Sequence, residues 1–186
     1  LRRRADDPVR LLDGRGHRLT GRLAGRNGKA ARIEITAVTR DETELAPPRL
    51  RLVCGVVKGR RWEYALEKAV ELGVHGIVPL LAEHGVVEPG KGRRERWLGV
   101  LRSALKQSGR AGLPELGEPV GLGAALTMAG AGPVFVGTVP GEVDDVPPLA
   151  APEGAAWWTV FIGPEGGWTA AERAALGAAG ASPLAL

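Results

Sequence analysis

The chain has little of the chemistry that builds disulfide-bonded, zinc-bound or membrane-spanning proteins. Its 186 residues include one cysteine, Cys54, and three histidines, so an internal disulfide is excluded and no structural zinc set is available. No apolar run approaches the roughly 18 residues that span a membrane, and the basic start at residues 1–4 lacks the apolar region of a secretory signal. These absences predict a cytoplasmic protein without a metal or a membrane partner.

Positive charge is in modest excess and unevenly placed. Lysine and arginine number 25 against 21 aspartate and glutamate, which gives a net charge of +4. The basic residues gather in the first third of the chain and again between residues 91 and 110. Such clusters are typical of surfaces that follow a phosphate backbone, and they are equally compatible with a solvated, arginine-rich surface.

Two regions differ in pattern. Residues 1–46 contain short alternating segments at 9–13 and 31–38 with glycine turns between them, which indicates a small β-barrel. Pro47 and Pro48 mark a boundary, because proline disfavours both helix and sheet pairing. The pattern predicts later strands at 50–57, 77–81, 133–137 and 159–163, and helices at 61–72 and 93–108.

Strands that alternate with helices predict an α/β domain over 49–186, with a parallel sheet covered on both faces. The glycine-, alanine- and proline-rich segment 117–155 is expected to be rich in loops around the strand at 133–137. Cys54 lies in an apolar strand, where it is expected to be a small buried hydrophobic residue.

The strongest local signal is a strand, a glycine loop and a helix between residues 160 and 179. Gly166 and Gly167 allow the backbone to approach a ligand, and Thr169 with Glu172 forms a capping box that starts the next helix. Ligands of parallel α/β sheets bind at the carboxyl ends of strands. The loop therefore predicts either a ligand cradle or a tight strand-to-helix connection.

Two other enzyme classes are disfavoured. The segment 85–92 has the spacing of a phosphate-binding P-loop, but Gly92 stands where that loop needs Ser or Thr as a magnesium ligand. No Gly-x-Ser-x-Gly elbow is present, and a thiolate at Cys54 is disfavoured by its apolar surroundings. Nucleotide hydrolysis and nucleophilic hydrolysis are therefore set aside.

Taken in order, several segments resemble one family, the 16S ribosomal RNA (uracil-N3)-methyltransferases, which form the RsmE-like branch of the SPOUT class. The matching segments are 57–63, 67–74, 77–80, 82–87, 106–110 and 162–169. The resemblance covers roughly residues 50–186, and the ordered set is far more specific than any one segment.

This resemblance implies a SPOUT α/β fold with a deep C-terminal trefoil knot, preceded by a small PUA-like β-barrel that binds RNA. It implies S-adenosyl-L-methionine (SAM) as cofactor, a homodimer, and 16S rRNA or the assembled small ribosomal subunit as partner, methylated on N3 of a uridine. The implied cofactor-binding residues are Thr138, Val139, Gly163, Pro164, Glu165, Gly166, Gly167, Leu184 and Leu186. The family pattern extends beyond both ends of this chain, so both domains, 1–46 and 49–186, are expected to be incomplete.

Methyl transfer from a sulfonium needs alignment more than covalent catalysis, and uracil N3 must lose a proton. We expect Arg110 to favour the resulting anion and Glu165 to orient the cofactor or take the proton; a simpler reading is that both only complement helix dipoles. The candidate substrate-binding residues are Arg3, Arg4, Lys106, Gln107 and Arg110. The alternatives are a knotted methyltransferase with a tRNA target and an RNA-binding protein without catalysis.

Overall fold

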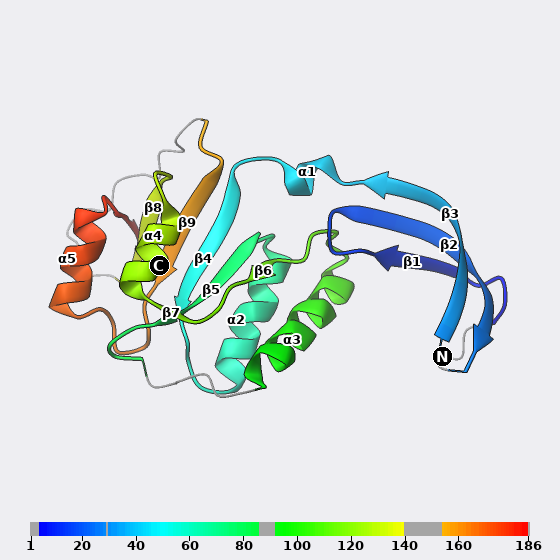
Figure 1. The fold of residues 1–186 in the computed structure, drawn as a ribbon, viewed down its shortest axis with the longest axis horizontal. Helices are drawn as coiled ribbons and strands as arrows, with labels where there is room; N and C mark the ends of the chain where they lie inside the picture. The colour runs from blue at the N-terminus through cyan, green and yellow to red at the C-terminus, as the bar shows by residue number, and fades with distance from the viewer. Residues whose placement is uncertain (1–3, 29, 86–91, 140–153, 186) are drawn as a thin grey trace.

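A small antiparallel sheet stands beside a larger α/β unit (Figure 1). The computed structural model describes residues 4–28, 30–85, 92–139 and 154–185. The boundary between the units falls at the short helix α1 (Glu42–Leu45) and the cis Pro47–Pro48 bond that follows it. The two prolines thus lie between the small sheet and β4 (Arg49–Gly55), the first strand of the α/β unit.

The small sheet has the order β1 (Pro8–Leu12), β2 (His17–Asn27), β3 (Ala30–Arg40). Both pairings are antiparallel, and the β2–β3 register shifts at Thr20/Gly21 and Leu23/Gly25. A Cβ at Gly21 would lie 2.3 Å from the carbonyl oxygen of Glu34, so the first shift requires glycine. The outer strands match the expected ones. The central strand β2 had no counterpart in the sequence pattern, because its glycines and arginines obscure the alternation.

The α/β unit is built on a seven-stranded sheet whose strands all pair in parallel. Its order is β10-β8-β9-β4-β5-β6, and β7 also pairs with β5. The strands are β4 (Arg49–Gly55), β5 (Gly76–Leu81), β6 (Glu115–Leu116), β7 (Val120–Gly121), β8 (Val134–Thr138), β9 (Trp157–Ile162) and β10 (Ser182–Ala185). The helices are α2 (Arg60–Glu71), α3 (Arg93–Ser108), α4 (Leu122–Ala129) and α5 (Ala170–Ala178).

Helices cover both faces of this sheet, as the apolar strands predicted. Leu52 and Cys54 face the cluster under α2 and α3, where Trp62 and Trp97 meet edge to face at 5.5 Å between ring centroids. Val53, between them on β4, belongs to the opposite cluster under α4 and α5. Each face therefore buries alternate side chains of the same strand.

The helices expected at 61–72 and 93–108 and the strands expected at 50–57, 77–81, 133–137 and 159–163 are present within a few residues. Helix α4 lies within the segment 117–155 that was expected to be rich in loops, and it was not predicted, because its mostly apolar residues give little contrast between a buried and an exposed face. Residues 140–153 of that segment, and residues 86–91 of the P-loop-like segment, lie outside the described part of the chain.

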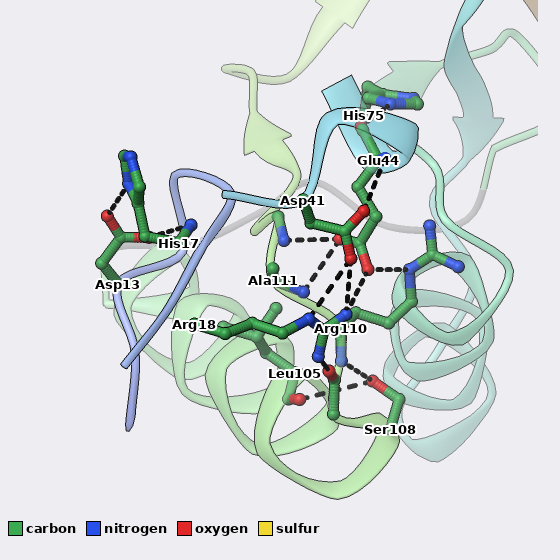
Figure 2. A network of polar contacts seen from close by, with 12 residues as sticks. Asp13, His17, Arg18, Asp41, Glu44, His75, Leu105, Ser108, Arg110 and Ala111 are labelled. Atoms are coloured by element: carbon green, nitrogen blue, oxygen red, sulfur yellow. Dashed lines mark hydrogen bonds and ion pairs between the residues drawn. The ribbon is translucent and has the colours of Figure 1, made fainter. Parts of the chain in front are cut away.

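One carboxylate joins the two units. Glu44 of α1 accepts hydrogen bonds on Oε2 from the backbone N–H groups of Ala111 and Gly112, at 2.8 and 2.7 Å. Its Oε1 faces Arg18 of β2 at 3.1 Å and Nε of Arg110 at 3.6 Å (Figure 2). The Glu44 side chain is only 11% exposed. The chain linking the two units is thus anchored on both of them.

His75 strengthens this anchor from the α/β side. Its Nδ1 accepts a hydrogen bond from the Leu50 N–H at 3.2 Å, and its Nε2 lies 2.8 Å from the Glu44 carbonyl oxygen. Arg18 adds a bond to Asp41, the N-cap of α1, at 2.8 Å, and donates to the Gly109 carbonyl. Both ring nitrogens of His75 are used when Nε2 carries the proton.

We expect Glu44→Ala to lower the free energy of unfolding by about 3 kcal/mol, because two backbone N–H groups and two guanidinium groups lose a shared partner in a mostly buried place. Urea unfolding followed by circular dichroism measures this loss. The matched control is Glu42→Ala, since Glu42 is 74% exposed and, among the described residues, pairs only with Arg40; it should cost less than about 0.5 kcal/mol. Equal losses in the two variants would contradict the anchoring role of Glu44.

Burial raises the pKa of the Cys54 thiol to about 11, so only about one thiol in a thousand is ionised at pH 8. We expect the native protein to react with a disulfide reagent at least about 100-fold more slowly than the protein unfolded in urea. Absorbance of the released thiolate measures both rates. Comparable rates in the two states would show that Cys54 is accessible.

Candidate active site

Three of the segments assigned to cofactor binding meet at one edge of the large sheet. Val136 on β8 pairs with Phe161 on β9, and Thr138 pairs with Ala185 on β10. Thr138 also donates its hydroxyl to the Leu184 carbonyl at 3.3 Å. Because the strands are parallel, the chain after Thr138, the loop 163–167 and the end of β10 leave the sheet at the same edge. Val139 is 53% exposed there, and Leu186 lies outside the described residues.

The backbone of the glycine loop 163–167 packs closely against the end of β4 and against the Trp168 ring. A Cβ at Gly55, the last residue of β4, would lie 2.8 Å from the Pro164 nitrogen, and one at Gly163 would lie 2.9 Å from the Trp168 ring. Gly167 has a φ of +69°, which other residues rarely adopt. A Cβ at Gly167 would meet nothing within 4 Å. The loop is thus fixed on its inner side and open at Gly167.

A buried carboxylate fixes the loop to a neighbouring turn. Glu172 accepts hydrogen bonds from the backbone N–H groups of Glu83 at 3.0 Å and Thr169 at 2.9 Å. The Thr169 hydroxyl accepts from the Glu172 N–H at 3.2 Å, so the expected capping box is present. His84 lies beside the loop, with Nδ1 2.9 Å from the Gly166 carbonyl oxygen. The turn at 82–84 is therefore part of the site, a contact that sequence reasoning missed.

Glu172 is only 6% exposed. Burial by itself raises the pKa of a carboxyl group, but the hydrogen bonds from Thr169 and Glu83 outweigh it and hold the pKa of Glu172 below its ordinary value. The ionised form is therefore the one that binds the two N–H groups. The only cue to this in the sequence was the capping-box spacing.

Glu165 lines a small cavity. The cavity measures about 280 Å³ and is lined by Val56, Val57, Lys58, Arg61, Pro164 and Glu165. The Glu165 carboxylate pairs with Arg61 from the first turn of α2. Arg61 had not been singled out from the sequence, although it lies within a segment of the family pattern.

Lys106, Gln107 and Arg110 lie elsewhere, beside the small sheet at the C-terminal end of α3. A Cβ at Gly73 would lie 2.1 Å from Nη2 of Arg110, so this guanidinium packs against the turn that precedes β5. Glu165 instead follows the carboxyl end of β9. Within one chain, the two candidate catalytic residues thus lie at opposite edges of the sheet and share no site.

The remaining candidates are at the start of the chain. Arg4 donates its backbone N–H to Asp7 at 2.7 Å, and Arg3 lies outside the described residues. Across the part of the chain that the structure describes, no cluster of three or more His, Cys, Asp or Glu residues has the geometry of a metal site. None of the described helices is both long and apolar enough to cross a bilayer.

Comparison with known proteins gives a consistent result. Residues 44–186 match the family described as RNA methyltransferase domain. A protein of Mycobacterium tuberculosis named ribosomal RNA small subunit methyltransferase E is 31% identical over 194 residues, covering 98% of this chain and 72% of its own length. One of the same name from Synechocystis is 29% identical over the whole chain, which spans only 61% of that relative.

Two solved structures share the fold along nearly the whole chain. The small subunit methyltransferase E of Neisseria gonorrhoeae, bound to S-adenosyl methionine, superposes with a TM-score of 0.84 at 30% identity, covering 98% of this chain and 76% of that one. A putative methyltransferase of Legionella pneumophila, in complex with SAM, gives 0.81 at 26% identity over 99% and 76% of the two chains. Because the family match covers most of its length, this chain belongs to the RNA methyltransferase domain family.

Proposed function

We propose that this protein is a SAM-dependent methyltransferase that methylates N3 of a uridine in 16S rRNA, acting in the cytoplasm on the RNA or the small ribosomal subunit. The observation that carries the proposal is that the carboxyl ends of β8, β9 and β10 lie side by side, with the glycine loop 163–167 after β9 and an open approach at Gly167. Relatives named for small-subunit rRNA methylation support the substrate, and the SAM-bound neighbours support the cofactor.

The fold proposed with this function is the SPOUT fold with a C-terminal trefoil knot. The strand order supports it, since the chain leaves β9, passes through α5 and returns as β10 on the far side of β8. This crossing places the last strand, β10, next to β8 and not next to β9, the strand that precedes it along the chain. The antiparallel pairing of β1, β2 and β3 supports a PUA-like barrel for the small unit. Among the described residues, β1 and β3 are not paired with each other.

The residues at the strand ends fit SAM. Backbone groups of Gly163, Gly166 and Gly167, with Thr138 and Leu184 opposite, would hold the nucleoside, and bound SAM would supply a methyl group on a sulfonium. Glu172 keeps the loop in place before the ligand arrives, so less ordering remains to be done on binding. Glu165, which lines the cavity beside Arg61, would orient the ligand or take the N3 proton.

Arg110 needs a second chain to act at this site. In one chain it is committed to Glu44 and Gly73 at the other edge of the sheet. We propose a homodimer in which the α3 end of one copy approaches the loops of the other, where Lys106 and Gln107 would contact RNA. In that arrangement Arg110 would favour the uracil anion across the interface.

The central test is SAM binding by calorimetry with the chain and with a Gly167→Val variant. We expect one SAM site in the unchanged chain and at least about tenfold weaker binding in the variant, because valine strains a positive φ and fills the open approach. Circular dichroism establishes that the variant is folded. Absence of binding at millimolar SAM would contradict the proposal. Mapping of methylated nucleotides by primer extension then separates an rRNA target from a tRNA target.

Glu172→Gln should weaken SAM binding by about three- to tenfold, since an amide presents one oxygen, not two, to the N–H groups of Glu83 and Thr169. The control is Glu83→Gln, which removes the same charge from an exposed side chain and leaves its backbone bond in place. Calorimetry on both variants gives the comparison. A similar loss in both would attribute the effect to net charge.

The same carboxylate should give a pH signature. Because its pKa is lowered on folding, its contribution to stability is complete above the ordinary value of 4.5 and is lost as the pH falls through the folded value. We expect the difference in unfolding free energy between the unchanged chain and Glu172→Gln to shrink below pH 4.5. Urea titrations at several pH values measure it; a difference that grows on acidification would contradict the assignment.

A further inference from the structure

One peptide group of the glycine loop is held at both of its polar atoms. The N–H of Gly167 donates to the Pro164 carbonyl at 2.9 Å, which closes the turn 164–167 on itself. The carbonyl of Gly166, in the same peptide group, lies 2.9 Å from Nδ1 of His84, which is 82 residues earlier in the chain. The first contact gives the turn its shape, whereas the second fixes the turn against the segment that follows β5.

The segment that carries His84 is itself well fixed. The N–H of Gly85 binds the carbonyl three residues earlier at 2.8 Å, and the N–H of Glu83 binds the buried carboxylate of Glu172 at 3.0 Å. A Cβ at Gly166 would lie only 3.0 Å from the Cβ of His84, so the two backbones approach closely. The His84 ring therefore reaches the Gly166 carbonyl from a nearby support that backbone hydrogen bonds hold in place.

The contact with the loop selects one state of the His84 ring. A carbonyl oxygen can only accept, so Nδ1 must carry a hydrogen for the bond to form, and the neutral ring then has its free lone pair on Nε2. His75 shows the opposite state, because its Nδ1 accepts from the Leu50 N–H and its proton is on Nε2. His17 differs again, since its Nδ1 lies 2.7 Å from the carboxylate of Asp13. His84 is thus the histidine whose ring state is set by the glycine loop.

We propose that His84 is a positioning residue for the cofactor loop, acting through a hydrogen bond from its Nδ1 to the Gly166 carbonyl. The inference rests on the proposed function, which supplies SAM as the ligand of this loop. His84 acts without touching SAM. It holds the peptide group between Gly166 and Gly167, so that the open side of Gly167 keeps the orientation that receives the ligand. A contact made before binding reduces the ordering that binding must still achieve.

The test uses substitutions of His84 that separate the donor from the bulk of the ring. His84→Asn keeps an amide N–H close to the position of Nδ1, His84→Gln carries its amide to the position of Nε2, and His84→Ala removes the donor altogether. The control is His17→Ala, which removes a histidine with an equally direct Nδ1 contact in the small sheet, away from the loop. Calorimetry measures the SAM affinity, and urea unfolding establishes that each variant is folded.

We expect His84→Ala and His84→Gln to weaken SAM binding by about three- to tenfold, the range for the loss of one hydrogen bond. His84→Asn should stay within about twofold of the unchanged chain, and so should His17→Ala. Unchanged SAM affinity in His84→Ala would overturn the inference. An equal loss in His84→Asn and His84→Ala would also overturn it, because the ring would then matter for its bulk and not for its donor.

Two measurements on the protein without SAM report on His84 directly. NMR of the ring nitrogens at about pH 8.5, where imidazoles are neutral, should show the proton of His84 on Nδ1 and that of His75 on Nε2. Hydrogen exchange of the Gly167 N–H should be faster in His84→Ala and should return to the original rate in His84→Asn.

These measurements distinguish the inference from the proposed function. A His84 ring protonated on Nε2, or a Gly167 exchange rate that ignores the His84 substitutions, would overturn the inference even in a chain that binds SAM. The expected ring state and exchange rates in a chain that binds no SAM would overturn the proposed function and leave the contact of His84 with the loop standing.

Discussion

The arrangement of the two units depends on the carboxylate of Glu44. A single buried side chain accepts from two backbone N–H groups on the turn after α3 and faces arginines from both units. A carboxylate that is largely buried is stable only when hydrogen bonds and ion pairs occupy both of its oxygens. Removing one partner would leave the buried charge uncompensated, so the protein strongly favours this one geometry. The placement of the small sheet beside the end of α3 is therefore set by this anchor.

Glu172 repeats the same device at the other edge of the sheet. It too is buried, accepts from two backbone N–H groups, and joins segments that are distant in the sequence, residues 83 and 169. In each case the backbone supplies the donors, so the contact fixes the path of the chain more than the position of a side chain. A loop held this way is ready to receive a ligand without a large cost of ordering.

Sequence patterns predicted the α/β unit well because its strands are apolar on both faces and its helices have one buried side. The central strand β2 and helix α4 were not predicted, since a strand interrupted by glycine and arginine and a mostly apolar helix show no such contrast. At the site, the glycine loop and its capping box were predicted from local spacing alone. The contacts of Glu172 with Glu83, and of Arg61 with Glu165, join segments that lie 89 and 104 residues apart. No local pattern encodes such contacts.

The position of Arg110 shows where the family resemblance and the geometry of one chain diverge. The segment 106–110, at the basic end of α3, matches the family pattern. The guanidinium of Arg110 nevertheless pairs with Glu44 and lies over Gly73. An arginine held by a largely buried carboxylate keeps its planar donors oriented, and the Arg110 atom paired with Glu44 is Nε, at 3.6 Å from Oε1. The Glu44 contact therefore leaves the remaining donors of Arg110 for another partner. In the proposed homodimer, the carboxylate that anchors the small sheet would also orient Arg110 toward the second copy, so that the placement of this arginine would depend on one largely buried charge.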